Sequence, residues 1–589
     1  MISTEQRMGI PQTIREAIIR EKQLRNNLAQ LDQYSLIARD KRQEVVENLV
    51  FFTDPQSFPA ACRDLLREIE VGFYQGDVSL HAKHLAFLSE LALALRSLLP
   101  RWILMDTQVY GQSALTTDQI QAVVDDIKAL LESLSADAPD VEKSILKAVE
   151  LEVAARYKAE QAPDPAAEAR ALVSSSLIEY LENASSEISN SQLKRIAEMR
   201  FEGKTATELS NDYAAFLQHT LYLGASFATT NPPLVNMAWD ILPDTWDPMI
   251  DKIILTHPEA GSQDLAKLVT MEVVLAQMRL LRPIFLITDG RMGCVCFQVD
   301  PNKHADAEAM TGNALFFYEE LRTRLGGGIP NVVFKLPGTQ AGLQACRSLT
   351  RRGIGVTITV NFGMFQHLPF AQAIREGHAL YACLVEMNGR LAYPVRDELL
   401  AKLDELAGYG IDEARARQAA AWAGVIVARR LYKMLNDHGV DQNRSKILIA
   451  SLRIYEGVAY RELPSAYPDI TEIVGVNLLS VFPNVRRAFD QSAEVVLNPF
   501  QVENPVPEYV LDILRYSEIF KQAYYVADQS WFKGEDGRFK PDKELVLEDE
   551  EGVFNWPPVH NTLVEFMNSY NSLVKRLDER KQMVLGIPK

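Results

Sequence analysis

The first 160 or so residues place apolar and polar positions with the period of an α-helix. Two runs show this most clearly: Ile14, Ile18 and Ile19, and then Val123, Val124, Ile127, Leu130, Leu131 and Leu134. Such spacing puts the apolar side chains on one face of each helix. More helix follows a short linker at Ala162-Pro-Asp-Pro-Ala166. Residues 1–190 are therefore predicted to form an all-helical N-terminal domain, for which we expect a role in packing, oligomerisation or partner binding.

The pattern changes after about residue 220, where short apolar runs alternate with helical stretches. Seven runs have the length of β-strands: Pro283–Thr288, Cys294–Val299, Val332–Leu336, Gly355–Val360, Ala382–Glu386, Lys446–Arg453 and Ile473–Val476. Strands that alternate with helices form parallel sheets, and this many units suit a closed barrel. We predict an α/β fold with a (β/α)8 TIM barrel in residues 191–490. Residues 491–589 are predicted to be a helical extension that packs on the barrel.

Alternate residues of a barrel strand point into the barrel. This alternation gathers polar residues on one face of four predicted strands, toward the C-terminal end where such barrels carry their active sites. On the strand that contains Ser451 and Arg453, we expect Leu448, Ala450 and Leu452 to face the opposite way. The alternative is a β-sandwich of amphipathic strands, but the intervening helices favour parallel pairing. The polar residues concerned are Gln298, Lys335, Thr357, Thr359, Ser451 and Arg453.

Composition narrows the class of protein. The chain has 589 residues, of which 47% are hydrophobic, and this predicts a globular protein of several domains. A net charge of -17 argues against a nucleic-acid partner, because phosphate binding needs clustered cations. We recognise no N-terminal signal segment and no stretch of membrane-spanning length. Five scattered cysteines suit a reducing cytoplasm, and the nine histidines show no metal-binding spacing, so no metal is expected.

Lys335 is the strongest candidate for covalent chemistry. It lies in the apolar run Asn331-Val-Val-Phe-Lys-Leu-Pro-Gly-Thr339. Burial disfavours an ammonium group and lowers its pKa toward that of a neutral amine. A neutral amine attacks carbonyl groups and forms Schiff bases. Taken alone, the segment also fits an edge strand with a surface lysine.

Two of six separated motifs within residues 220–490 are Ala228-Thr-Thr-Asn-Pro-Pro-Leu-Val235 and Asn331–Leu343. The first is similar to the TTNPSL segment of the transaldolase family of (β/α)8 barrels, and the second closely resembles the lysine motif of that family. The order and spacing of the motifs are more specific than any one of them. The others are Asp289-Gly290 with Val299-Asp-Pro301, Gly353–Phe362, Gly389-Arg390 and Ala450-Ser-Leu-Arg453, similar to DG…VSxEVDP, GINxNxTLLF, the GR of SPFxGR and ASFR.

The resemblance implies a reaction between phosphorylated sugars. Lys335 would capture the carbonyl of a ketose phosphate as a Schiff base. Retro-aldol cleavage would then leave a dihydroxyacetone enamine that adds to an aldose phosphate. Thr230 and Asn231 would contact the bound three-carbon unit, and Thr359 would orient the catalytic water. No cofactor is expected, because the lysine iminium itself is the electron sink.

The resemblance also implies that Arg390, Ser451 and Arg453 bind the substrate phosphate. Two guanidinium groups give permanently charged, bidentate recognition of a phosphate. For either arginine the alternative is an ion pair with a nearby carboxylate. Phosphorylated ketoses and aldoses are the expected partners, and the helical extensions allow a homo-oligomer.

The chain departs from the family pattern at the residues that move protons. Gln298 stands where transaldolases carry a glutamate, and a carboxamide cannot transfer a proton. The related fructose-6-phosphate aldolases also have glutamine there, but they use a tyrosine at the position of Met387. We therefore propose Glu386 as a substitute acid or base, with a solvated strand-end carboxylate as the alternative. Thr357 replaces an asparagine that contacts substrate in the family.

The aspartate of the family's first strand has no clear counterpart. Leu193–Phe201 is the nearest candidate for that strand, but its pattern is more typical of a helix. Asp212 lies at a tolerable distance before the second strand. Three functions therefore stay open: transaldolase-like transfer or direct aldol cleavage, another Schiff-base reaction, and a non-catalytic scaffold whose helical domains bind a partner.

Overall fold

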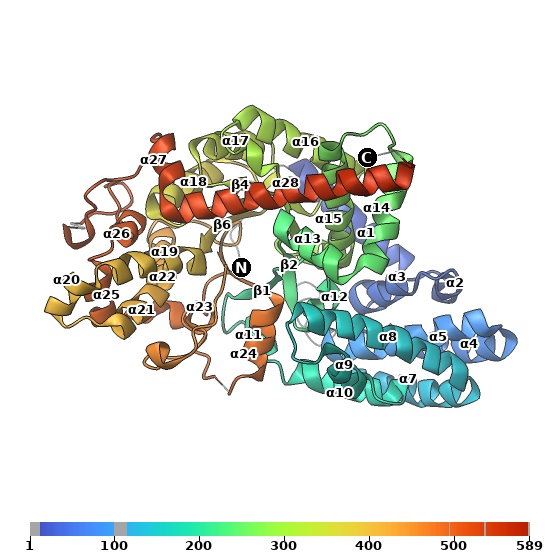
Figure 1. Ribbon diagram of the computed structural model, residues 1–589. Coiled ribbons are helices and arrows are strands. Elements are labelled where there is room, and N and C mark those ends of the chain that lie inside the picture. The colour runs from blue at the N-terminus through green and yellow to red at the C-terminus, as the bar shows by residue number, and fades with distance from the viewer. Residues whose placement is uncertain (1–11, 99–114, 494, 535–536, 587–589) are drawn as a thin grey trace.

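Eight parallel strands form a closed barrel at the centre of the molecule (Figure 1). The computed structural model describes residues 12–98, 115–493, 495–534 and 537–586. The strands follow one another around the barrel in chain order, and β8 pairs with β1 to close it. The predicted (β/α)8 barrel is confirmed. The strands are β1 (Glu208–Asn211), β2 (Ala225–Ala228), β3 (Cys294–Gln298), β4 (Val332–Pro337), β5 (Gly355–Thr359), β6 (Ala382–Met387), β7 (Ser445–Ala450) and β8 (Leu478–Val481).

Five of the seven predicted strands overlap β3 to β7, and two do not coincide with a strand. Pro283–Thr288 lies at the end of α15 (Ser262–Ile287), a 26-residue helix whose last eight residues are almost entirely buried. A helix covered on all sides loses its polar stripe, so its apolar run has the same appearance as a buried strand. Ile473–Val476 precedes β8, and Val474 and Val476 form only an isolated bridge.

Polar residues on β1 explain why the sequence pattern gave no strand there. Glu208 is buried inside the barrel, where Lys446 of β7 donates a 2.7 Å hydrogen bond to its carboxylate. Ser226 of β2 donates to the other carboxylate oxygen at 2.9 Å. A buried charge is tolerated when it is paired and hydrogen-bonded in this way. The barrel interior is thus closed by an ion pair below the level of Lys335.

Helices surround the barrel and connect its strands. Leu193–Phe201 falls in a helix, as its pattern indicates, and the chain enters β1 six residues after that helix ends. The helices of this region are α11 (Gln192–Phe201), α12 (Leu217–Tyr222), α13 (Pro232–Ile241), α14 (Pro243–Thr256), α15 (Ser262–Ile287), α16 (Ala307–Arg324), α17 (Gln340–Thr350), α18 (Met364–Glu376), α19 (Asn388–Ala401), α20 (Leu403–Leu406), α21 (Glu413–Ala421), α22 (Ala423–Asp437), α23 (Pro468–Thr471) and α24 (Pro483–Gln491).

The described residues before α11 are helical, as predicted. Thr116 and Gln119 form a reciprocal capping box that begins α7. Contrary to the expectation from sequence, the 20 residues of α5 are long and apolar enough to span a membrane, but half of them are buried inside this helical domain. These helices are α1 (Gln12–Leu28), α2 (Gln33–Ala38), α3 (Arg42–Glu47), the π-helix η2 (Asn48–Phe52), α4 (Phe58–Gln75), α5 (Val78–Ser97), α7 (Thr117–Asp137), α8 (Pro139–Ala159), α9 (Pro165–Val173) and α10 (Leu177–Ser189).

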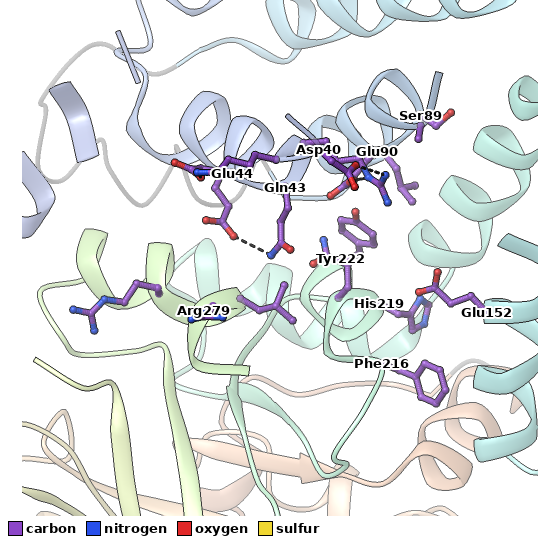
Figure 2. A pocket seen from close by; sticks show the side chains of 18 of the residues that line it. Asp40, Gln43, Glu44, Ser89, Glu90, Glu152, Phe216, His219, Tyr222 and Arg279 are labelled. Atoms are coloured by element: carbon purple, nitrogen blue, oxygen red, sulfur yellow. Dashed lines mark hydrogen bonds and ion pairs between the residues drawn. The ribbon is translucent and has the colours of Figure 1, made fainter. Parts of the chain in front are cut away.

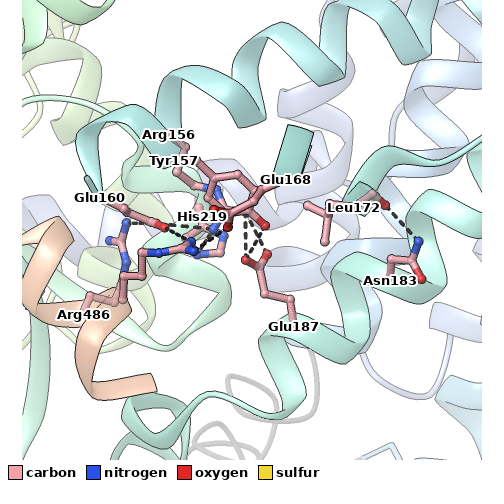
Figure 3. Close-up of polar contacts among 10 residues, drawn as sticks. Arg156, Tyr157, Glu160, Glu168, Leu172, Asn183, Glu187, His219 and Arg486 are labelled. Atoms are coloured by element: carbon pink, nitrogen blue, oxygen red, sulfur yellow. Dashed lines mark hydrogen bonds and ion pairs between the residues drawn. The ribbon is translucent and has the colours of Figure 1, made fainter. Parts of the chain in front are cut away.

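A buried network of charged residues joins the helical domain to the barrel (Figure 3). Arg156 of α8 donates to Glu187 of α10 at 2.8 Å and to the ring of His219 on α12 at 2.9 Å. Burial, and then the neighbouring Arg156, hold the pKa of His219 well below its ordinary value, so the imidazole is neutral and accepts this bond. Glu160, the C-cap of α8, in turn accepts a 2.7 Å bond from Arg486 on α24. The two parts of the chain are therefore fixed to each other by paired charges.

Beside this network, a large cleft separates the helical domain from the barrel helices. Its volume is about 1870 Å³. Figure 2 shows Glu90 of α5 on the helical-domain side above Tyr222 of α12, and Gln43 and Glu44 of α3 above Arg279 of α15. Acidic and basic side chains are mixed along its walls. The residues predicted to form the catalytic site do not line this cleft.

The C-terminal region ends in one long helix that crosses the barrel (Figure 1). This helix, α28 (Pro557–Leu585), packs Tyr570, Leu573 and Leu577 against α13, α14 and α15. Arg580 binds Asp251 of α14 through two hydrogen bonds of 2.7 Å, which anchors the far end of α28. The preceding helices are α25 (Glu508–Leu514), α26 (Glu518–Tyr524) and α27 (Glu550–Asn555).

Candidate active site

A cavity of about 420 Å³ opens at the carboxyl ends of the strands. Seven of the ten residues predicted from sequence to form the site line it. Apolar side chains from β6, β7 and α13 complete its walls. The barrel thus gathers side chains that are up to about 220 positions apart in the chain. The seven residues are Asn231, Lys335, Thr357, Thr359, Arg390, Ser451 and Arg453.

Lys335 projects from β4 into this cavity. Only 6% of its surface is exposed. Burial lowers its pKa, and the like charge of Arg390 acts in the same direction, whereas Cys296 and Asp212 oppose the shift. In the barrel register, Lys335 lies between Gln298 on β3 and Thr357 on β5. The amine is therefore enclosed and is easier to deprotonate than a surface lysine.

Asp212 supplies a carboxylate to the same cavity. It follows β1 directly and accepts a 2.6 Å hydrogen bond from Thr229. Burial raises its pKa, while the nearby charge of Lys335 and the bond from Thr229 limit the increase. The sequence left this residue unassigned, because β1 is too short and too polar to be recognised. Its position at a strand end beside Lys335 makes it a candidate for proton transfer.

Two threonines of β5 face the cavity, as the strand alternation predicts. Thr357 accepts a 3.3 Å hydrogen bond from the thiol of Cys296, which lies on the neighbouring β3. The hydroxyl of Thr359 is 3.7 Å from the sulfur of Met387, a weak acceptor. Thr359 can therefore direct its hydroxyl toward a water molecule or a ligand at little cost.

The two predicted polar residues that follow β2 and the one that ends β3 differ in their placement. Asn231 caps α13, its side-chain oxygen accepting from Leu234 N–H at 3.0 Å, and it lines the cavity. Thr230 instead donates to the backbone carbonyl of Cys296 at 2.9 Å and does not line the cavity. Gln298 does not line it either, and its buried side-chain oxygen has no hydrogen-bond partner among the described residues. Thr230 and Gln298 are thus displaced from the substrate surface expected for them.

Glu386 does not face the cavity, contrary to the prediction. Its neighbours Val385 and Met387 line the cavity, so the alternation of β6 directs Glu386 outward. There it is fully buried and lies 2.8 Å from the ring nitrogen of His367 on α18. Burial raises the pKa of Glu386 well above its usual value and lowers that of His367 to about 3. The residue packs a strand against a helix and does not line this cavity.

Arg390, Ser451 and Arg453 lie together at one end of the cavity, but not by the alternation expected for β7. That strand ends at Ala450, and both Leu448 and Ala450 face the cavity. Ser451 then takes a left-handed conformation, with φ of 61°, which interrupts the alternation. The turn carries Ser451 and Arg453 back to the cavity wall. The predicted cluster is present, whereas the predicted face of the strand is wrong.

A glycine and an aspartate hold this turn in place. Gly389 donates to the carbonyl of Ser451 at 3.0 Å, and a Cβ atom at Gly389 would lie 2.4 Å from that oxygen. Only glycine permits this approach. Asp469 accepts from the backbone N–H of Arg453 and from the side chain of Asn388, both at 3.0 Å. The start of α19 and the end of β7 are thereby fixed as one unit.

Comparison with known proteins agrees with this geometry. Residues 215–494 match the family model described as transaldolase/fructose-6-phosphate aldolase. This match is consistent with a divergent member of the transaldolase family. A transaldolase of Trichodesmium erythraeum is 25% identical over 299 residues, which cover 47% of this chain and 75% of that protein. Transaldolase 1 of Streptomyces avermitilis is 28% identical over 233 residues, which cover 38% of this chain and 57% of that protein.

These matches support an enzyme of the transaldolase or aldolase type. A transaldolase of Campylobacter jejuni is 24% identical over 279 residues, 47% of this chain and 77% of that protein. The match to the family model leaves out the helical domain and most of the C-terminal region, including α28.

The barrel nevertheless receives part of its cavity wall from α28. Glu565 forms two hydrogen bonds of 2.7 Å with the guanidinium of Arg390. The ring centre of Phe566 lies 5.7 Å from the nitrogen of Lys335 and 5.4 Å from the guanidinium carbon of Arg390. Sequence reasoning allowed an ion pair for Arg390 but could not name its partner. A glutamate on an amphipathic helix 175 positions away carries no local signal.

Proposed function

We propose that the protein is a Schiff-base enzyme that cleaves and forms carbon–carbon bonds in phosphorylated ketoses. The observation that carries the proposal is the buried amine of Lys335, enclosed in a cavity with a carboxylate beside it and arginines at one end. Burial favours the neutral amine, which is the form that attacks a ketone. The match of the barrel to the family model supports the same chemistry.

The covalent cycle starts when the amine of Lys335 adds to the ketone. The resulting carbinolamine loses water to give an iminium ion. The bond between the α and β carbons of the iminium then breaks, its electrons neutralise the iminium as an enamine, and the β-hydroxyl loses its proton as an aldehyde leaves. In transfer, the enamine carbon attacks the carbonyl of an acceptor aldose, whose oxygen takes up a proton. Hydrolysis of the new iminium releases the product and restores the amine.

Asp212 is the proposed acid and base of these steps. Among the described residues that line the cavity, the carboxylates are Asp212 and Glu565, and Glu565 is paired with Arg390. Burial brings the pKa of Asp212 closer to the range in which a carboxyl group both takes and gives a proton. Thr359 would hold the water that relays this proton. Asn231, whose side-chain oxygen caps α13, keeps its NH₂ group for a substrate hydroxyl.

Arg390, Ser451 and Arg453 are proposed to bind the substrate phosphate. The hydroxyl of Ser451 has no hydrogen-bond partner among the described residues, so it is ready to donate to an anion. Guanidinium groups stay charged at all working pH values and match the geometry of a phosphate.

Direct aldol cleavage is the second candidate, because Gln298 is the residue found in fructose-6-phosphate aldolases and the matching family model covers both activities. The two are separated by adding fructose 6-phosphate with and without an aldose phosphate acceptor. A transferase turns over only with the acceptor, whereas an aldolase releases dihydroxyacetone without it.

Reduction with borohydride tests the shared step. In the presence of fructose 6-phosphate, we expect mass spectrometry to locate one reduced adduct on Lys335. Lys335→Met should show no adduct while keeping the circular dichroism spectrum of the parent protein. Failure of the parent protein to form an adduct with any of a panel of ketose phosphates would leave the scaffold hypothesis in its place.

A further inference from the structure

The anion-binding end of the cavity already holds an anion that belongs to the chain. Both carboxylate oxygens of Glu565 accept hydrogen bonds from Arg390, each 2.7 Å long. This two-bond arrangement is the one an arginine also uses to hold a phosphate. Glu565 reaches it from α28, outside the residues that match the transaldolase family. A ligand phosphate and this carboxylate therefore need the same guanidinium.

The charges at this end of the cavity are unbalanced by one. Arg390 and Arg453 contribute two positive charges, and Glu565 contributes one negative charge. The hydrogen bond from Arg390, and then the charges of Arg390 and Arg453, hold the pKa of Glu565 below its usual value, so the carboxylate is ionised. Arg453 makes no ion pair with a carboxylate among the described residues, and its guanidinium stacks 5.2 Å from the ring of Tyr393. Of the two arginines, Arg453 is thus the one whose guanidinium is left for a ligand.

A movement of the whole helix α28 would not separate Glu565 from Arg390, because α28 is held in place. Phe566, the next residue, is 2% exposed and packs over Lys335. Further along α28, Asp578 accepts from Ser262, and Arg580 is paired with Asp251. The backbone of α28 is therefore held at both ends of this segment, whereas the carboxylate itself is half exposed. Rotation of the Glu565 side chain, with the backbone of α28 in place, would free Arg390.

We propose that Glu565 is a specificity-determining residue that lowers the affinity of the cavity for phosphate. It competes with the phosphate of a ketose for Arg390, so that ketoses without phosphate are accepted alongside phosphorylated ones. This inference rests on the phosphate site of the proposed function. Removing the negative charge should strengthen phosphate binding about tenfold, since the charges are a few ångströms apart at a partly solvated site.

Calorimetric titration with inorganic phosphate tests the inference without requiring turnover. Glu565→Gln is expected to bind phosphate about tenfold more tightly than the parent protein, and Glu565→Asp, which keeps the charge, to bind it with nearly the parent affinity. Glu579→Gln is the matched control, because it makes the same change on the same helix at a 60% exposed side chain outside the cavity. This control should bind phosphate as the parent protein does.

Three results would overturn the inference. The first is that the parent protein and Glu565→Gln bind phosphate with equal affinity. The second is that neither protein binds phosphate. The third is that the phosphate affinity of Glu579→Gln rises as much as that of Glu565→Gln. Kinetics give a second readout: the ratio of kcat/KM for fructose 6-phosphate to that for fructose should rise about tenfold in Glu565→Gln. The outcome is separable from the proposed function. If Glu565→Gln binds phosphate more tightly but the parent protein forms no borohydride adduct, the Schiff-base reaction is refuted and the role of Glu565 stands. If the adduct forms but phosphate binding by Glu565→Gln is unchanged, the Schiff-base reaction stands and the role of Glu565 is refuted.

Discussion

Replacing Glu386 by glutamine separates a packing role from a catalytic one. The residue is fully buried between β6 and α18, and its contact with His367 is 2.8 Å long. One oxygen of Glu386 and the other ring nitrogen of His367 have no hydrogen-bond partner among the described residues. A buried ion pair needs those remaining positions satisfied. We infer that Glu386 is a neutral acid beside the neutral imidazole of His367. A glutamine can replace this acid with little change in shape.

The expected effect depends on pH in a defined direction. Burial raises the pKa of Glu386, so the folded protein keeps a proton that the unfolded chain loses above about pH 4.3. Each pH unit above that value therefore lowers the stability of the parent protein by up to about 1.4 kcal/mol, until the pH reaches the folded-state pKa. Glutamine has no such proton. Glu386→Gln should cost about 1 kcal/mol at pH 4 and become relatively more stable as the pH rises.

His367 affects both proteins alike. Burial lowers the pKa of His367 to about 3. The stability contributed by the neutral ring is therefore fully present above about pH 6.5 and is lost progressively as the pH falls from 6.5 to about 3. The comparison between the parent protein and Glu386→Gln therefore isolates the carboxyl group.

Urea denaturation between pH 4 and pH 8, followed by tryptophan fluorescence, measures this difference. Glu472→Gln is the contrasting variant, because Glu472 forms a buried 2.8 Å ion pair with Arg429 and its loss should cost about 3–5 kcal/mol throughout the pH range. A constant loss of that size in Glu386→Gln would show that the Glu386 pair is ionised. A folded Glu386→Gln that no longer forms the borohydride adduct or no longer turns over fructose 6-phosphate would refute the placement of Glu386 outside the site.

Three further changes test other parts of the structure. Asp212→Asn should lower kcat about 10²–10⁴-fold while Lys335 still forms a borohydride adduct, and loss of the adduct would argue against proton transfer as its role. Arg453→Lys should raise KM for fructose 6-phosphate about tenfold but leave KM for fructose unchanged in steady-state assays. Arg156→Met should destabilise the protein by about 3–5 kcal/mol in urea, because Glu187 would lose its buried partner, whereas Glu160 keeps Arg486; an unchanged midpoint would contradict this.

The sequence predicted the barrel because its central strands are apolar runs separated by helices of ordinary length. It failed where burial or polarity disguised an element: the last turns of α15 had the appearance of a strand, and the paired charges inside the barrel concealed β1. Because β1 was not recognised, the sequence did not assign Asp212 to the end of a strand. Both failures arise because local pattern reports the environment of a segment and not its backbone conformation.

Within the site, alternation was reliable on β4 and β5, but it also predicted Gln298 of β3, which does not line the cavity. It placed Lys335 and Thr359 correctly, and applied to Val385 and Met387 it would also have placed Glu386 on the outer face. It misled beyond Ala450, where the left-handed Ser451 reverses the direction of the following side chains. The pairing of Arg390 with Glu565 could not be predicted, since it depends on how α28 crosses the barrel.

The crossing of α28 also bears on how the protein becomes competent during synthesis. All eight strands are complete at Val481, yet the wall formed by Phe566 belongs to a segment made more than eighty residues later. A nascent chain that has closed its barrel still exposes the amine of Lys335 to solvent on that side. The amine becomes sheltered on this side only when α28 docks, so the enclosure of Lys335 depends on a segment outside the barrel and would be incomplete in an isolated barrel.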